Sequence, residues 1–162
     1  MSDLTPLLET LRGLARAQDD LKAAALAKRD ALTACRLSEI EQATAREEEA
    51  LARLAPLESA RAAALARLLP GERHPRLSLL LPQADGPERL ELEALREHLR
   101  RGAGEVARVN RLNAQLSEQA LTHFAGYVQV LAHSGLGSEQ QVYTRKGAPS
   151  QFAASALVSR NA

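Results

Sequence analysis

The chain has 162 residues, 45% apolar and 25% charged, and its 21 Lys and Arg nearly balance its 20 Asp and Glu. This composition is typical of long amphipathic helices, and the mixed charges offer no uniform field for a phosphate backbone, so no nucleic acid is expected as a partner. The first residues lack a signal peptide, and no apolar run reaches the roughly 20 residues that span a bilayer. With Cys35 as the single cysteine, we expect a cytoplasmic protein without membrane insertion.

The first expected helix covers about residues 6–35 and carries a heptad seam, with apolar positions spaced alternately by three and four. Gln18 and Lys28 interrupt it. Each either fixes the register of packing or is an edge position without such a role, and we favour the edge position. Cys35 is expected to be a small packed residue on the seam. The seam consists of Leu4, Leu7, Leu11, Leu14, Gln18, Leu21, Ala25, Lys28, Leu32 and Cys35.

A second helix is expected over about 38–69, after a tight turn. Ser38 and Glu41 fit a capping box at its start, and Pro56 should kink it. The run Glu47 to Glu49 is expected to be solvated. In the linker that follows, the apolar patch 77–81 is expected to form one helical turn that plugs the end of the bundle.

A third helix is expected over about 87–134, because Asp85, Pro87 and Glu88 form a start signal and a long apolar seam follows. Gly102 and Gly104 lie in its middle, where they mark a bend or let another helix approach closely. At 1.5 Å per residue this helix is roughly 72 Å long, against roughly 45 Å for each of the others. If it starts near the end of the second helix, its last turns extend beyond the hairpin.

The expected fold is therefore all-α: a long antiparallel helical hairpin plus a long third helix, as a coiled-coil-like bundle over residues 1–137. Residues 138–162 lose the periodicity and are expected to be a flexible tail. Phe152, Ala156 and Leu157 fit one short terminal helix, which would be marginal in isolation.

Catalytic and metal-binding patterns do not occur in the sequence. The four histidines lack the i,i+4 spacing of a helical metal site, and no phosphate-binding glycine loop or nucleophile elbow is present. We expect no enzyme activity, no metal site and no cofactor.

The four aromatic residues all lie in the last 39 positions. Aromatic side chains carry much of the contact energy at interfaces, so the C-terminal end is the expected contact region. On the last turns of the third helix, two of the aromatic residues join two aliphatic residues to form a candidate binding surface. Its members are Phe124, Tyr127, Val128 and Leu131.

The third helix carries Asn110, Leu112, Asn113 and Leu116, and the tail carries Tyr143 and Gly147. With these residues, the third helix and the tail resemble the FlgN family of bacterial flagellar type III export chaperones. The shared pattern has paired Asn residues near a Leu in the last long helix, and then a Tyr followed four residues later by a Gly. The two leading coiled-coil helices also fit this family. The residues that match are Asn110, Leu112, Asn113, Leu116, Tyr143 and Gly147.

The resemblance implies a chaperone that binds the C-terminal helical segments of hook-associated proteins, which form the hook–filament junction. It would prevent their premature assembly and deliver them to the cytoplasmic domain of an export-gate membrane protein. Tyr143 and Gly147 would then contact the gate, and the candidate surface would contact the client. A monomer or weak dimer is expected.

Two other interpretations stay open. A structural or scaffold coiled-coil protein would self-associate through the same seams and have no client. A small helical regulator of another secretion system would share the same composition.

Overall fold

The structure, a computed structural model, describes residues 4–133, and this part of the chain consists of helices joined by short loops and contains no strand. The all-α prediction is confirmed. No described helix is both long and apolar enough to cross a membrane. The chain divides into two compact units after Glu118, so residues 119–133 are described separately from the bundle. The elements are α1 (Thr5–Thr33), α2 (Leu37–Leu68), α3 (Leu77–Leu80), the 3-10 turn η1 (Leu81–Gln83) and α4 (Gly86–His133).

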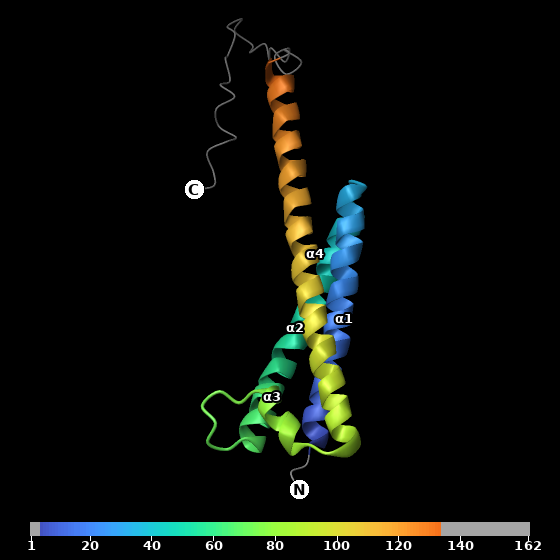
Figure 1. Ribbon diagram of the computed structural model, residues 1–162. Coiled ribbons are helices and arrows are strands. Elements are labelled where there is room, and N and C mark those ends of the chain that lie inside the picture. The colour runs from blue at the N-terminus through green and yellow to red at the C-terminus, as the bar shows by residue number, and fades with distance from the viewer. Residues whose placement is uncertain (1–3, 134–162) are drawn as a thin grey trace, which may run out of the picture. The chain divides into compact units, whose positions relative to one another are not determined.

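Helices α1 and α2 form an antiparallel hairpin (Figure 1). Near the turn, Lys28 Nζ donates to Glu47 Oε2 at 2.9 Å. Far from the turn, a Cβ atom on Gly13 would lie 3.1 Å from Leu57 Cδ2, so the Leu57 side chain of α2 packs against the α1 backbone there. Residue numbers that rise along α1 fall along α2, as an antiparallel pair requires.

Helix α4 packs on α1 in the parallel direction (Figure 1). Besides the contact of His98 with Asp19, four polar contacts join the two helices, and residue numbers rise together along both. Helix α1 therefore has a partner on two sides. In order along α1, the contacts are Arg12 Nε to Glu91 Oε1 at 2.6 Å, Gln18 Nε2 to the Leu99 carbonyl at 3.1 Å, Lys22 Nζ to Glu105 Oε2 at 3.0 Å, and Asn113 Nδ2 to the Ala25 carbonyl at 2.9 Å.

The main hydrophobic core lies at the end of the bundle where α1 and α4 begin and α2 ends. The predicted apolar turn in the linker is confirmed as α3, and Leu80 of this turn is buried in the core. The chain thus closes the end of the bundle while it connects α2 to α4. The largest fully buried side chains of the bundle are Leu7, Leu11, Leu14, Leu65, Leu92 and Val109.

The placement of Cys35 on the seam is wrong, because α1 ends two residues earlier and the thiol is exposed. Cys35 has a φ of 53°, in the left-handed region. The Arg36 N–H donates to the Ala31 carbonyl at 3.0 Å and the Cys35 N–H to the Leu32 carbonyl at 3.2 Å. This is the Schellman pattern, which usually places Gly at the left-handed position. The absence of a Gly concealed the helix end in the sequence.

The capping box at Ser38 is also wrong, because α2 begins at Leu37 and Arg36 is the residue before its first turn. Arg36 has an extended backbone and makes no side-chain cap hydrogen bond. Its guanidinium instead pairs with Glu39 at 3.1 Å. The Schellman motif ties the Arg36 N–H to α1, so the second helix starts directly after it and Ser38 already lies inside.

The two polar residues of the α1 seam are not edge positions, as favoured above, because both bond to another helix. Gln18 donates to the Leu99 carbonyl, and its amide lies against Gly102 of α4. Lys28 pairs with Glu47, whose side chain is only 13% exposed. The expectation that the whole Glu47 run is solvated is therefore wrong for Glu47. Both polar positions of the seam serve the contact between helices.

Gly102 and Gly104 provide a matched pair for testing this packing. A Cβ atom on Gly102 would lie 2.5 Å from Gln18 Oε1, whereas a Cβ atom on Gly104 would meet nothing within 4 Å. Gly104→Ala should stabilise the protein by about 0.5–1 kcal/mol through helix propensity. Gly102→Ala should be about 1–2 kcal/mol less stable than Gly104→Ala, because it displaces the Gln18 amide and its hydrogen bond. Urea unfolding measures both.

The background variant Gln18→Ala is the control for this comparison. With the glutamine amide removed, Gly102→Ala and Gly104→Ala should have nearly the same effect on the free energy of unfolding. A difference that persists in this background would contradict the assigned contact.

Candidate functional site

The four residues of the candidate surface lie on α4, and all are exposed. Phe124 is 67% exposed, Tyr127 70%, Val128 49% and Leu131 52%. Their spacing of three, one and three residues places them on one face of a helix, where residues three and four apart are neighbours. They form one continuous strip, which we call the apolar strip.

The apolar strip continues the three-four spacing of the bundle-facing seam of α4. Within the bundle, Leu92 and Val109 of this seam are fully buried. Leu116 is half-buried, and every residue from Gln119 to His133 is exposed. The sequence pattern that requires a partner helix thus persists after the burial ends.

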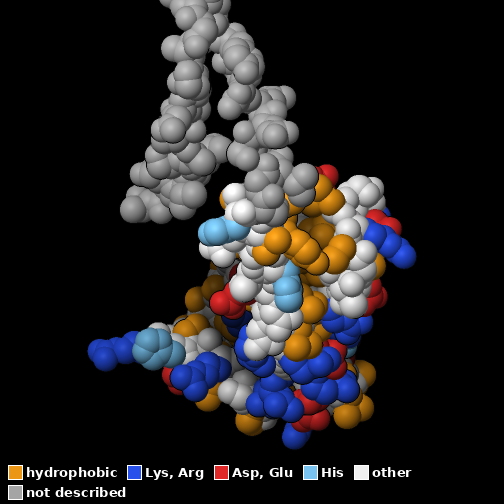
Figure 2. All heavy atoms as spheres, turned by 90° about the horizontal axis from the view of Figure 1, so that it is seen from above, with side chains coloured by type: hydrophobic (Ala, Val, Ile, Leu, Met, Phe, Trp, Pro, Cys, Tyr) orange, Lys and Arg blue, Asp and Glu red, His pale blue; other side chains and the backbone are white. Residues whose placement is uncertain are grey.

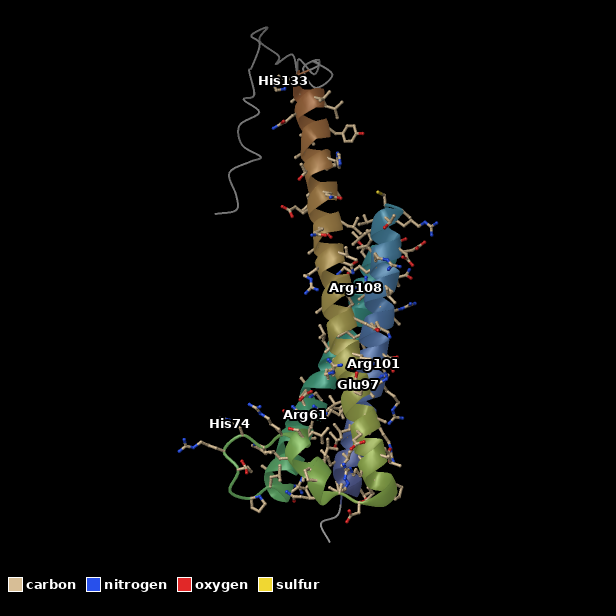
Figure 3. All side chains as sticks on the ribbon, in the orientation of Figure 1. Arg61, His74, Glu97, Arg101, Arg108 and His133 are labelled. Atoms are coloured by element: carbon tan, nitrogen blue, oxygen red, sulfur yellow. The ribbon has the colours of Figure 1, made fainter. Side chains whose placement is uncertain are left out.

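The charged side chains of α4 also end before this stretch. Glu97 forms ion pairs with Arg100 and Arg101 at 2.9 and 3.6 Å, and Arg108 follows on the same face (Figure 3). Residues 119–133 contain no Lys, Arg, Asp or Glu. In the space-filling view, hydrophobic side chains lie at the surface close to the end of the described chain (Figure 2).

Sequence reasoning missed two members of this surface. Leu121 is 70% exposed and Val130 is 65% exposed, and they extend the apolar area on either side of the apolar strip. The seam spacing did not include them. The signal that identifies them is the absence of charge from Gln119 to His133, since an exposed helix normally carries charged residues.

This arrangement suits the binding of another helix. A contiguous apolar area on a soluble protein marks an interaction site. Anchors at i, i+3, i+4 and i+7 are the pattern by which helices pack along each other. Phe124 and Tyr127 supply the aromatic area that dominates contact energy, and the Tyr127 hydroxyl adds a polar group at the edge.

The rest of the described chain offers no comparable site. A shallow groove of about 700 Å³ lies between α1 and α4, and two pairs of its polar side chains bond across it. Arg12 reaches Glu91 at 2.6 Å, and His98 Nε2 lies 3.1 Å from both Asp19 carboxylate oxygens. Residues 4–133 contain no cluster of His, Cys, Asp and Glu suited to a metal ion. The predicted gate-contact residues Tyr143 and Gly147 lie outside the described residues, as does the tail.

The exposure of the apolar strip predicts little cost of truncation in the free protein. Phe124→Ala with Tyr127→Ala should change the free energy of unfolding by less than about 1 kcal/mol, because exposed side chains have little packing to lose. Leu92→Ala, at a fully buried position of the same seam, should cost about 2–5 kcal/mol. Chemical denaturation compares the two, and equal large losses would place the aromatics in a core.

Comparison with known proteins shows which family the chain matches. A family model described as "FlgN protein" matches residues 1–151. Searches of curated proteins and of solved structures gave no significant match. The family match includes all the described helices and the segment that holds Tyr143 and Gly147.

Proposed function

We propose, from the premise that this chain belongs to the FlgN family of flagellar export chaperones, that the apolar strip of α4 is its client-binding surface. The clients are the hook-associated proteins of the hook–filament junction, and the segments bound are their C-terminal helices. Binding in the cytoplasm prevents premature assembly of the client and keeps it ready for export. The protein acts without enzymatic chemistry and without a cofactor.

The observation that carries this proposal is an exposed apolar and aromatic strip with helical spacing. A segment that assembles through helix packing has an amphipathic face of its own. A chaperone can occupy that face by offering a helix with the same spacing, so that each apolar strip removes the other from water. Residues 119–133 carry no charge to oppose such a contact or to pair with the wrong partner.

Delivery requires a second contact, with the cytoplasmic domain of an export-gate membrane protein. We assign the residues of this chain that make it as Tyr143 and Gly147. The assignment rests on family membership and on the separation of the two regions along the chain. A client held at residues 124–131 leaves residues 143–147 available for the gate.

Client binding can be tested with one double variant and a matched control. Phe124→Ala with Tyr127→Ala should weaken binding of a fluorescently labelled C-terminal segment of a hook-associated protein by about 2 kcal/mol or more, which is roughly 30-fold. The control His123→Ala with Gln129→Ala changes two exposed polar side chains of the same stretch and should leave affinity nearly unchanged. Anisotropy titration measures both.

Light scattering on the same double variant distinguishes a chaperone from a scaffold protein. A scaffold would use the apolar strip to bind its own copies, so light scattering would show a defined oligomer that Phe124→Ala with Tyr127→Ala dissociates. The proposed chaperone is a monomer or weak dimer whose mass rises by one client. Failure of the labelled segment to bind the wild-type chain would contradict the client assignment.

The gate contact gives a distinct expectation. Tyr143→Ala should leave the affinity for the client segment unchanged and should lower both gate binding and the amount of hook-associated protein exported. The comparison variant Tyr127→Ala should lower client affinity and leave binding to the purified gate domain intact. An equal loss of client affinity in both variants would contradict the separation of the two contacts.

A further inference from the structure

We infer that Gln18 and Asn113 are positioning residues that select the register of α4 on α1, and thereby set how much of the apolar seam of α4 stays uncovered. The register itself follows from contacts within the bundle. Its consequence for binding rests on the proposed function of the apolar strip.

We call the contacts of Gln18 and Asn113 with the facing helix the register lock. Its first half is the packing of Gln18 against Gly102. The Gln18 amide donates to the Leu99 carbonyl at 3.1 Å, so it lies along the surface of α4. A Cβ atom on Gly102 would lie 2.5 Å from Gln18 Oε1 and 2.9 Å from Gln18 Cδ. A side chain at the position opposite Gln18 would therefore displace the Gln18 amide from its observed place.

The second half is a buried amide. Asn113 is only 6% exposed, and its Nδ2 atom donates to the Ala25 carbonyl at 2.9 Å. Its Oδ1 atom is buried and has no hydrogen-bond partner among the described residues. A buried amide that is only partly satisfied is costly where a leucine would pack well. A single polar residue in a heptad seam is known to select register at the expense of stability.

Other registers fail at both positions. If α4 moved by one heptad towards its own N-terminus, Val109 would face Gln18 and Ala120 would take the place of Asn113. A movement in the opposite direction would bring Leu95 to Gln18. Gly102 is the only glycine of the α4 seam between Leu92 and Leu131, since Gly104 and Gly126 fall outside its spacing. Only the observed register therefore satisfies both halves of the lock.

The spacing of the seam alone permits a different register. The seam continues through Leu116, Ala120 and Phe124, and α1 would cover more of it if α4 moved towards its N-terminus. The ion pairs Arg12–Glu91 and Lys22–Glu105 are too exposed to prevent this movement, with side chains 34–51% exposed. The lock therefore fixes the observed register, in which Leu116 is half-buried and residues 119–133 are exposed.

Two spin labels can report this register directly. Cys35 is the only cysteine and is exposed at the tip of the hairpin, and Gln115→Cys supplies an exposed site on α4. Electron–electron distance measurement should give one population for the otherwise native chain. With Gln18→Ala and Asn113→Leu added, a second and longer distance should appear, displaced by up to about 10 Å, the rise of one heptad.

The control carries Gln42→Ala and Asn110→Leu, which make the same changes at exposed positions, and it should keep the native distance alone. A single unchanged distance in the folded Gln18→Ala and Asn113→Leu variant would overturn the inference. Loss of helicity in that variant would overturn it too, since the two residues would then support the fold and not select among registers. No client is present, so the result does not depend on the proposed function.

Discussion

The burial of α1 on two sides is the constraint on which the rest of the structure depends. Helix α2 packs against it in the antiparallel direction and α4 in the parallel direction, and Leu7, Leu11 and Leu14 are almost completely buried as a result. A helix enclosed in this way must carry slim side chains, because close helix packing leaves room for little else. Its other buried positions are Leu8, Leu21 and several alanines, such as Ala24 and Ala25. The same constraint agrees with the absence of aromatic residues from the first 123 positions of the sequence.

Much of the fold could be predicted because helix periodicity is a local property of the sequence. The seam spacing and the prolines were enough to identify three long helices and the turn at α3. The tight turn at the tip of the hairpin was expected, but the residue at which α1 ends could not be predicted, since Cys35 adopts a left-handed conformation that is usually recognised in a sequence by a Gly. The role of Gln18 was hidden for a different reason. It depends on Gly102, which lies on another helix, and no local pattern indicates which residue will stand opposite a polar position in a seam.

The candidate site shows the same division between local and non-local information. Spacing and aromatic content were sufficient to select Phe124, Tyr127, Val128 and Leu131, and the structure describes all four as exposed. Exposure itself could not be derived from spacing, because the seam has the same pattern where it is buried at Val109 and where it is not at Leu131. Leu121 and Val130 show that the surface is broader than one helical strip. The distribution of charge indicates this surface where periodicity does not, because an exposed helical stretch without charged residues is typical of a binding surface.

The parallel docking of α4 on α1 has a consequence for how the protein is made. The Lys28–Glu47 contact joins residues 19 apart in the sequence, whereas the contacts between α1 and α4 join residues 79 to 88 apart. During synthesis the hairpin can therefore close while α4 is still absent, and local contacts form sooner than distant ones. At roughly 5–20 residues per second, residues 69–113 take about 2–9 s to follow. For that interval the face of α1 that receives α4 is exposed to water. A protein that belongs to a family of chaperones thus exposes an apolar helix face of its own to water during its synthesis.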